Sequence, residues 1–263
     1  FRHNIRNSRL DLVNAAMGAT GSDCGCYRLD EHVLSHRPHL VFLEFAVNDW
    51  DKAQSQIQAS VEAILRRIWT SNPRTGVIIL ISGSRNDSQA TLVYRHIAEQ
   101  FRLYCFDVGA VKRRLILTGK ETNESLFSDT VHPTDHGHEV YAKTVIRCLD
   151  ELWRQSGTLP ARHRVSPRPL HWRTVEYLGA KMIPPSKTSH GGEWRITQDS
   201  YKKFDGVYPV REEYPDRSPL TWPFPYRHGL LCSDRAGSWI EIRGKMHATG
   251  LSLDSFSEET EIE

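Results

Sequence analysis

Residues 40–49 read Leu-Val-Phe-Leu-Glu-Phe-Ala-Val-Asn-Asp, an apolar run that ends on two polar side chains. Leu40–Phe45 is predicted to be a strand buried on both faces, because a continuous apolar run is typical of parallel sheets, whereas an alternating one is not. Asn48 and Asp49 follow at the carboxyl end of this strand, which is the end where open α/β sheets bind ligands. The stretch therefore predicts a parallel sheet with a polar site at one edge.

Predicted helices and strands alternate on both sides of this run, over residues 9–155. Apolar residues recur at helical spacing in several segments, and short apolar runs between turns predict further strands. Such alternation is typical of an α/β domain with helices on both faces of a parallel sheet. The expected elements are strands at Leu10–Val13, Val77–Ile81 and Leu103–Val108, helices that start at Ser22 or Asp23, run over Asp51–Trp69 and start at Asp87 or Ser88, and a last helix carrying Tyr141, Val145, Cys148, Leu149 and Leu152.

The character of the chain changes after residue 155. Residues 156–175 are rich in Pro and Arg, lack periodicity and are predicted to be a linker. Residues 176–263 contain short aromatic runs between turns, including Tyr177–Ile183, and predict a small sandwich-like β-domain. The chain begins at Phe1 and ends within a predicted strand, so we expect domain 1–155 to be N-terminally incomplete and domain 176–263 to be C-terminally incomplete.

The composition is that of a soluble globular protein, with 39% hydrophobic and 25% charged residues in a chain of 263. The formal net charge of +2 and the scattered basic residues argue against a nucleic-acid partner. No apolar run approaches the roughly 18 residues that a membrane span needs. The five cysteines have neither the spacing of a disulfide framework nor that of a zinc site. The oligomeric state and the compartment stay open.

Asp129 and His132 stand three residues apart, directly before Pro133. A short turn can hold the carboxylate against the ring, as a catalytic triad requires of its base and its orienting acid. The alternative is a helix-capping Asp followed by a surface His. The turn lies before the last helix of the α/β domain, and this position favours the catalytic interpretation. His136 and His138 are predicted to start that helix and not to bind a metal, since no Cys pair joins them.

Two further features suggest groups that stabilise a developing negative charge. The Asn48 side chain could donate to an oxyanion, or it could cap the helix that follows. The turn Gly18-Ala19-Thr20-Gly21 could present backbone N–H groups at a helix N-terminus, or it could be only a tight connection. Each feature is ambiguous alone, so their order along the chain carries the argument.

In this order the features resemble the motifs of the SGNH (GDSL-type) hydrolases. Asn14-Ala15-Ala16-Met17-Gly18-Ala19 is similar to the second motif, Ala46-Val47-Asn48-Asp49 to the third, and Asp129-Thr130-Val131-His132-Pro133 to the last. The resemblance covers about residues 9–155 and implies a flavodoxin-like, three-layer sheet of strand order 2-1-3-4-5. It also implies a Ser-dependent ester hydrolase without metal or cofactor. His132 is then the base, Asp129 its orienting group, and Asn48, Gly18 and Ala19 the oxyanion groups.

The sequence departs from the family pattern in two ways. The Gly of the second motif aligns with Ala19, so the backbone angles there decide whether the N–H stays available. The first motif, an apolar strand ending in Gly-Asp-Ser, is absent. Gln198-Asp199-Ser200 and Leu253-Asp254-Ser255 resemble it but follow no suitable strand, and Ser22 and Ser84 lack the motif. We therefore expect the chain to lack both the first strand and the nucleophile.

The favoured interpretation is a hydrolase of small-molecule or glycan esters, in particular a carbohydrate O-deacetylase with a β-rich accessory module. The alternative is a non-catalytic glycan-binding or scaffold remnant of such an enzyme, which the missing nucleophile favours. A phosphate- or nucleotide-binding domain is disfavoured, because the chain has no Gly-rich loop with a Lys.

Overall fold

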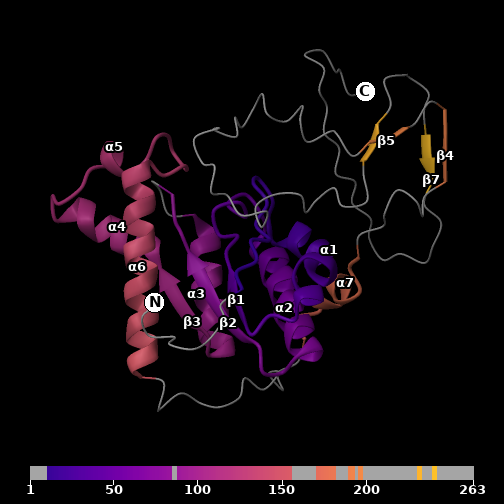
Figure 1. Ribbon diagram of the computed structural model, residues 1–263, viewed down its shortest axis with the longest axis horizontal. Helices are drawn as coiled ribbons and strands as arrows, with labels where there is room; N and C mark the ends of the chain where they lie inside the picture. The colour runs from indigo at the N-terminus through magenta and orange to yellow at the C-terminus, as the bar shows by residue number, and fades with distance from the viewer. Residues whose placement is uncertain are drawn as a thin grey trace.

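The core of the computed structural model is a parallel three-stranded sheet (Figure 1). The structure describes residues 11–84, 88–155, 170–181, 189–192, 195–197, 230–232 and 239–241. Strands β1 (Leu40–Leu43), β2 (Gly76–Ile81) and β3 (Tyr104–Asp107) lie in the order β1-β2-β3, with Val41 opposite Val77 and Ile78 opposite Tyr104. The predicted parallel sheet is confirmed.

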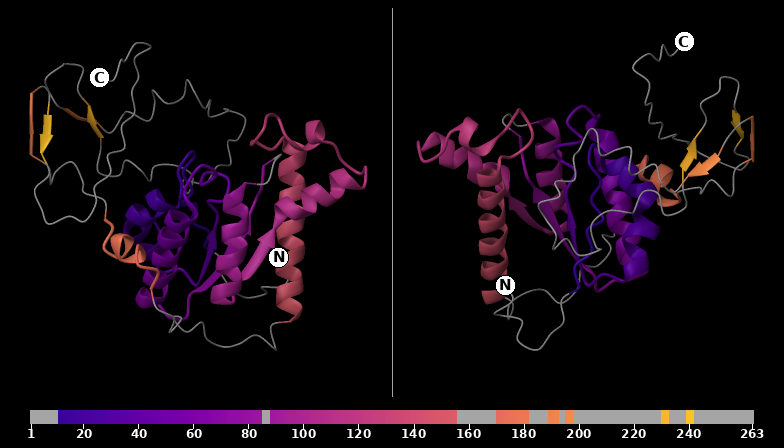
Figure 2. Two further views of the ribbon diagram at one scale, coloured as in Figure 1. Left: turned by 180° about the vertical axis from the view of Figure 1, so that it is seen from behind. Right: turned by 45° about the horizontal axis from the view of Figure 1, so that its top comes forward.

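The helices connect these strands and cover the sheet. Figure 2 shows α6 on one side of the sheet and α1, α2 and α3 on the other. In the described residues, no helix is long and apolar enough to cross a membrane. The helices are α1 (Ser22–His32), the 3-10 turn η1 (Leu34–His36), α2 (Gln54–Ser71), α3 (Gln89–Phe101), α4 (Val108–Leu117), α5 (Asn123–Leu126), α6 (Asp135–Arg154) and α7 (Thr174–Leu178).

The main hydrophobic core lies between β2 and helices α1, α2 and α3. The predicted apolar stripe of α2 is confirmed, because Ile57, Ile64 and Ile68 are each at most 1% exposed. Burying a side chain of this size stabilises the fold by about 2 kcal/mol. On the other side, the predicted stripe of α6 is only half-buried. Packing of α2 in the main core therefore fixes the positions of the strand ends that carry the candidate site.

Several predicted boundaries were wrong. Leu10 lies outside the described residues, and Asp11–Val13 form no strand, because no described strand lies beside them to complete a ladder. The helix expected from Asp51 begins at Gln54, since residues 46–52 form turns. The expected strand over Leu103–Val108 ends at Asp107, whose carboxylate accepts the Ala110 N–H and starts α4 at once.

The predicted cap of α1 also needs correction, whereas the predicted cap position of α3 is confirmed at Ser88. Ser22 lies inside α1, whose N-cap is Gly21, and no side chain at that position accepts a capping bond. Asp49 supplies the bond instead, since its Oδ1 accepts the Ser22 N–H at 3.0 Å. Ser88 occupies the N-cap position of α3 without a side-chain bond, and Asp87 lies outside the described residues.

The segment predicted as an aromatic strand run at Tyr177–Ile183 overlaps helix α7. Thr174 and Tyr177 are buried one helical turn apart, and the Thr174 hydroxyl donates to Glu62 of α2 at 3.2 Å. Two short antiparallel ladders follow: β4 (Ser189–Gly191) with β7 (Trp239–Glu241), and β5 (Arg195–Thr197) with β6 (Leu230–Cys232). The sandwich and the domain limits stay predictions, and most of the linker lies outside the described residues.

Candidate active site

The turn before α6 places the carboxylate of Asp129 against the ring of His132. Oδ2 of Asp129 lies 2.7 Å from Nδ1 of His132, and Oδ1 accepts the backbone N–H groups of Val131 and His132, both at 2.7 Å. The backbone and ring N–H groups of His132, together with the Val131 N–H, hold the pKa of the Asp129 carboxyl well below its usual range. A carboxylate that accepts from Nδ1 leaves Nε2 without a proton, so Nε2 can act as a base.

Backbone bonds close the base of this turn. The Ser128 N–H donates to the His132 carbonyl at 2.9 Å, and the Thr134 N–H donates to the Leu126 carbonyl at 3.0 Å. The Thr134 hydroxyl accepts the Gly137 N–H at 3.0 Å and so caps α6. A Cβ at Gly137 would lie 2.1 Å from the Leu126 carbonyl oxygen, so only glycine allows α6 to pack this closely. The start of α6 therefore fixes where His132 lies.

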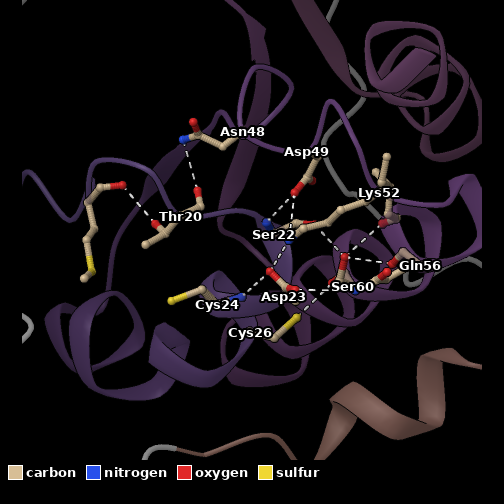
Figure 3. Close-up of polar contacts among 12 residues, drawn as sticks. Thr20, Ser22, Asp23, Cys24, Cys26, Asn48, Asp49, Lys52, Gln56 and Ser60 are labelled. Atoms are coloured by element: carbon tan, nitrogen blue, oxygen red, sulfur yellow. Dashed lines mark hydrogen bonds and ion pairs between the residues drawn. The ribbon is translucent and has the colours of Figure 1, made fainter. Parts of the chain in front are cut away.

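Asn48 lies in the loop after β1 and contacts Thr20 (Figure 3). The Asn48 side chain donates to the Thr20 carbonyl at 3.1 Å, and the Thr20 hydroxyl donates to the Met17 carbonyl at 2.9 Å. These bonds bring Asn48 to the turn that contains Gly18 and Ala19. In the described residues, no direct contact joins this group to His132. The structure therefore assembles the sequence candidates as two groups: Asp129 with His132, and Asn48 with the Gly18–Ala19 turn.

The backbone angles at Ala19 matter because this residue aligns with a glycine of the family motif. Its φ of 56° lies in the left-handed region, where an L-residue with a side chain costs roughly 1–2 kcal/mol. Gly18 has open space around it, since an added Cβ would meet nothing within 4 Å. Ala19 therefore adopts a backbone conformation that favours glycine, although it carries a side chain.

Asp49 has a structural role near the candidate site that the sequence did not predict. It is fully buried, and its carboxylate accepts from the Ser22 N–H at 3.0 Å, the Tyr94 hydroxyl at 2.7 Å and the Lys52 ammonium at 3.1 Å. Burial and this carboxylate raise the pKa of Tyr94 well above its usual value. Asp49 thus ties the loop that carries Asn48 to α1 and α3. Its place directly after Asn48 at the end of a buried strand was the only sequence signal.

A glycine completes this cluster. A Cβ at Gly21 would lie 2.2 Å from both Asp49 Oδ1 and Lys52 Nζ, so glycine alone leaves room for the ion pair. Lys52 also pairs with Asp23 of α1. The first turn of α1 and the loop after β1 are therefore held together by one network of charged groups around the buried Asp49 (Figure 3).

The structure adds detail on the other candidates. Ser22 is fully buried, with its Oγ 2.6 Å from Oγ of Ser60, so it cannot reach a substrate. His136 starts α6 as predicted; its Nε2 lies 2.8 Å from Oε1 of Glu121, and this hydrogen bond raises the pKa of His136. No group of three or more His, Cys, Asp or Glu side chains is arranged to hold a metal in the part of the chain that the structure describes.

An Asp–His pair in the turn before the last helix of a parallel α/β fold, together with an Asn in the loop after β1, is the arrangement that resembles the SGNH-type hydrolases. The match of residues 2–140 to the model of the GDSL-like lipase/acylhydrolase family agrees with this class. This match covers more than half of the 263 residues, and the chain belongs to that family. The resemblance inferred from the motifs is confirmed.

Solved structures share the fold. A two-domain esterase (CEX) active on acetylated mannans is 24% identical with a TM-score of 0.60, over 70% of this chain and 49% of that one. The same esterase co-crystallised with mannopentaose is 24% identical with a TM-score of 0.58, over 71% of this chain and 49% of that one. The chain thus spans about half the length of these esterases. No curated protein matches the sequence.

Proposed function

We propose that the protein containing this chain is a Ser-dependent ester hydrolase that removes acyl groups, acetyl in particular, from carbohydrate. The observation that carries the proposal is the 2.7 Å contact between Asp129 and His132 in a member of the GDSL-like family. The esterase active on acetylated mannans shares the fold and supports the choice of substrate class.

Each candidate group has a role in this reaction. The Ser hydroxyl attacks the ester carbonyl, and Nε2 of His132 takes its proton, while Asp129 stabilises the imidazolium that forms. His132 then protonates the leaving sugar oxygen, and water releases the acyl group in a second attack. A side-chain amide has two N–H donors. One Asn48 donor is held by the Thr20 carbonyl, so the other is free for the oxyanion, together with a backbone N–H of Gly18 or Ala19.

The nucleophile of this proposal is a Gly-Asp-Ser motif on a strand beside β1. The flavodoxin-like order puts the first strand at that position. Two observations support it: β1 is the edge of the described sheet, and Leu40 and Phe42 on this strand are each 41% exposed. An added strand with its helix would cover them.

An exposed tryptophan supports a sugar substrate. Trp50 follows Asn48 by two residues and is 68% exposed, and none of the described residues makes a ring contact with it. Flat aromatic side chains can bind the apolar faces of sugars, so Trp50 is a candidate sugar-binding side chain beside Asn48. The β-rich segment 176–263 is proposed as an accessory module. The side chains of the tryptophans in this segment lie outside the described residues.

The test is the release of 4-nitrophenol from 4-nitrophenyl acetate, measured for the longest natural form of the protein that contains this chain, beside its His132→Ala variant. Activity that disappears with His132 supports the proposal. The chain of 263 residues, assayed in parallel, shows where the nucleophile lies, since His132-dependent activity of this chain would place a working nucleophile within residues 1–263.

The second candidate is a non-catalytic glycan-binding protein, which the absence of a Gly-Asp-Ser motif in the chain favours. It predicts no His132-dependent hydrolysis in any natural form. Binding of mannopentaose, followed through tryptophan fluorescence, would then persist unchanged in the His132→Ala variant. In both cases Trp50→Ala should weaken sugar binding more than Trp172→Ala, a control that removes another tryptophan of high exposure.

A further inference from the structure

Lys112 carries a buried charge for which the proposed reaction has no use. The side chain comes from α4 and is only 2% exposed. Its ammonium donates to the Gly83 carbonyl at 3.2 Å and to the Tyr141 hydroxyl. No carboxylate among the described residues forms an ion pair with it. Burying an ammonium in this way is costly, so the partners that do surround it call for an explanation.

Two aromatic faces enclose this ammonium. Nζ of Lys112 lies 3.9 Å from the ring centroid of Phe127 and 4.2 Å from that of Tyr141. Each contact of this kind contributes about 0.5–2 kcal/mol, with the larger values at desolvated sites. The Tyr141 hydroxyl also donates to the Ser82 carbonyl at 2.8 Å. The ammonium is thus the point where α4, the end of β2, α6 and the Phe127 segment meet.

The two rings lie on either side of the Asp129–His132 turn in the chain. Phe127 precedes the turn and forms a β-bridge with Pro133. Tyr141 follows it on α6, the helix that begins two residues after Pro133. A group that holds both rings therefore holds both ends of the segment that carries His132.

We propose that Lys112 is a positioning residue for the Asp129–His132 turn, acting through Phe127 and Tyr141. The proposal rests on the hydrolytic role proposed for His132. Lys112 touches neither His132 nor the reacting atoms in this role. Its protonated form holds both rings through cation–π contacts, whereas the neutral amine keeps only hydrogen bonds. The geometry of the turn, and with it the rate of the reaction, then depends on the charge of Lys112.

Burial, together with the neighbouring charges, places this change in charge near neutral pH. Burial, and then the neighbouring Arg113, lower the pKa of Lys112 to about 7, against the opposing effect of Glu44. Glu44, at the end of β1, is itself buried, which raises its pKa, and it accepts from the Ser82 hydroxyl at 2.8 Å. Burial also raises the pKa of Tyr141 above its usual value. Lys112 is then the group that changes charge in this cluster near pH 7.

The test compares Lys112→Met with Arg113→Met, which removes the same charge from the next position on α4. For hydrolysis of 4-nitrophenyl acetate by the longest natural form, Lys112→Met should lower kcat by roughly ten- to a hundred-fold, the cost of a small displacement, with KM little changed. It should also remove the decline in kcat that we expect of the parent protein as Lys112 loses its proton with rising pH. Arg113→Met should keep kcat and should keep the decline but move it to higher pH, because Arg113 lowers the pKa of Lys112. An unchanged kcat and pH profile in Lys112→Met would overturn the proposal.

A second measurement separates this proposal from the proposed function. Hydrogen exchange of the Ser128 and Thr134 amides, which bond to the His132 and Leu126 carbonyls, reports the order of the turn without any activity. Lys112→Met should speed this exchange about ten-fold or more, the equivalent of losing one such contact. If Lys112→Met does not fold, Phe127→Leu, which removes one ring and keeps an apolar side chain, should have the same effect. Unchanged exchange in the variant that folds would overturn the positioning role, whether or not the protein hydrolyses esters.

Discussion

Oδ2 of Asp129 lies 2.7 Å from Nδ1 of His132, while Oδ1 of the same carboxylate holds the backbone of the turn through two N–H groups. One side chain therefore both shapes the loop and orients the base. Replacing it by Asn separates the two functions. The amide oxygen can still accept the backbone bonds, but the ring loses its anionic partner.

We expect Asp129→Asn to leave the fold intact and to lower kcat by up to about 10⁴-fold, as the same change does in a serine-protease triad. Asp135→Asn, at an exposed position in the first turn of α6, is the matched control and should change kcat little. The measurement is hydrolysis of 4-nitrophenyl acetate by the natural form. Equal activity of the two variants would remove Asp129 from the mechanism.

The lowered pKa of Asp129 sets a pH limit. Because the folded-state pKa lies below the unfolded one, the interactions of the carboxylate are fully present above about pH 4. They are lost only as the pH falls further, toward the lowered pKa. Ionisation of Asp129 should therefore cause no inflection in the pH–rate profile between about pH 4 and 8. Every inflection that the parent shows in this range should also be present in Asp129→Asn.

Gly137 offers a prediction whose sign opposes helix propensity. Gly→Ala inside a helix normally stabilises by about 1 kcal/mol. At this position the new Cβ would lie 2.1 Å from the Leu126 carbonyl oxygen and 3.0 Å from Cβ of Pro133. Gly137→Ala should therefore destabilise the protein by about 1–3 kcal/mol, because α6 must move away from the segment that holds the turn.

Urea unfolding of Gly137→Ala measures this cost, with Gly179→Ala as the control. An added Cβ at Gly179 meets nothing within 4 Å, so that variant should lie within about 0.5 kcal/mol of the parent. A stabilised Gly137→Ala would mean that α6 is not packed on the Leu126 carbonyl as described.

The spacing of apolar residues along the chain predicted the helices and strands whose burial repeats over a few residues. The spacing of Ile57, Ile64 and Ile68 identified α2, and the continuous apolar run at Val77–Ile81 identified β2, since each places one kind of surface on one face. The Asp129–His132 contact could be predicted for the same reason: both residues lie within one turn.

Contacts between distant segments could not be read from such patterns. Ser22 or Asp23 was expected to cap α1, but the acceptor of the Ser22 N–H comes from Asp49, 27 residues away. Similarly, the contacts of the Lys112 ammonium join α4, the end of β2 and α6. No local spacing in the sequence predicts that this lysine is buried. Asp49 and Lys112 hold the segments that carry the candidate site residues. The sequence therefore predicted the site residues better than the residues that position them.

The role of Asp49 leads to a stability prediction. Asp49→Ala leaves the Tyr94 hydroxyl, the Ser22 N–H and the Lys52 ammonium without their buried acceptor. Removing one partner of a buried ion pair costs about 3–5 kcal/mol, and we expect a loss of that size in urea unfolding. Asp51→Ala, at an exposed position, should change stability by less than about 0.5 kcal/mol.

A double-mutant cycle isolates the bond between Asp49 and Tyr94. Because Tyr94→Phe removes the hydroxyl that Asp49→Ala would strand, the two losses should overlap, and the double variant should be more stable than their sum predicts by about 0.5–3 kcal/mol. Additive losses would show that the 2.7 Å contact contributes little coupling.

Ala19 tests whether the turn keeps the conformation of the family glycine. At a φ of 56°, Ala19→Gly relieves roughly 1–2 kcal/mol of strain and costs about 0.5–1 kcal/mol in the entropy of the unfolded chain. We therefore expect net stabilisation of up to about 1.5 kcal/mol. Ala16→Gly, in the same segment but without a positive φ, should instead lower stability by about 0.5–1 kcal/mol. The backbone N–H of residue 19 survives the change, so kcat of the natural form should stay within about three-fold of the parent. If Ala19→Gly instead lowers stability as much as Ala16→Gly does, the left-handed turn and the donor that it presents do not form.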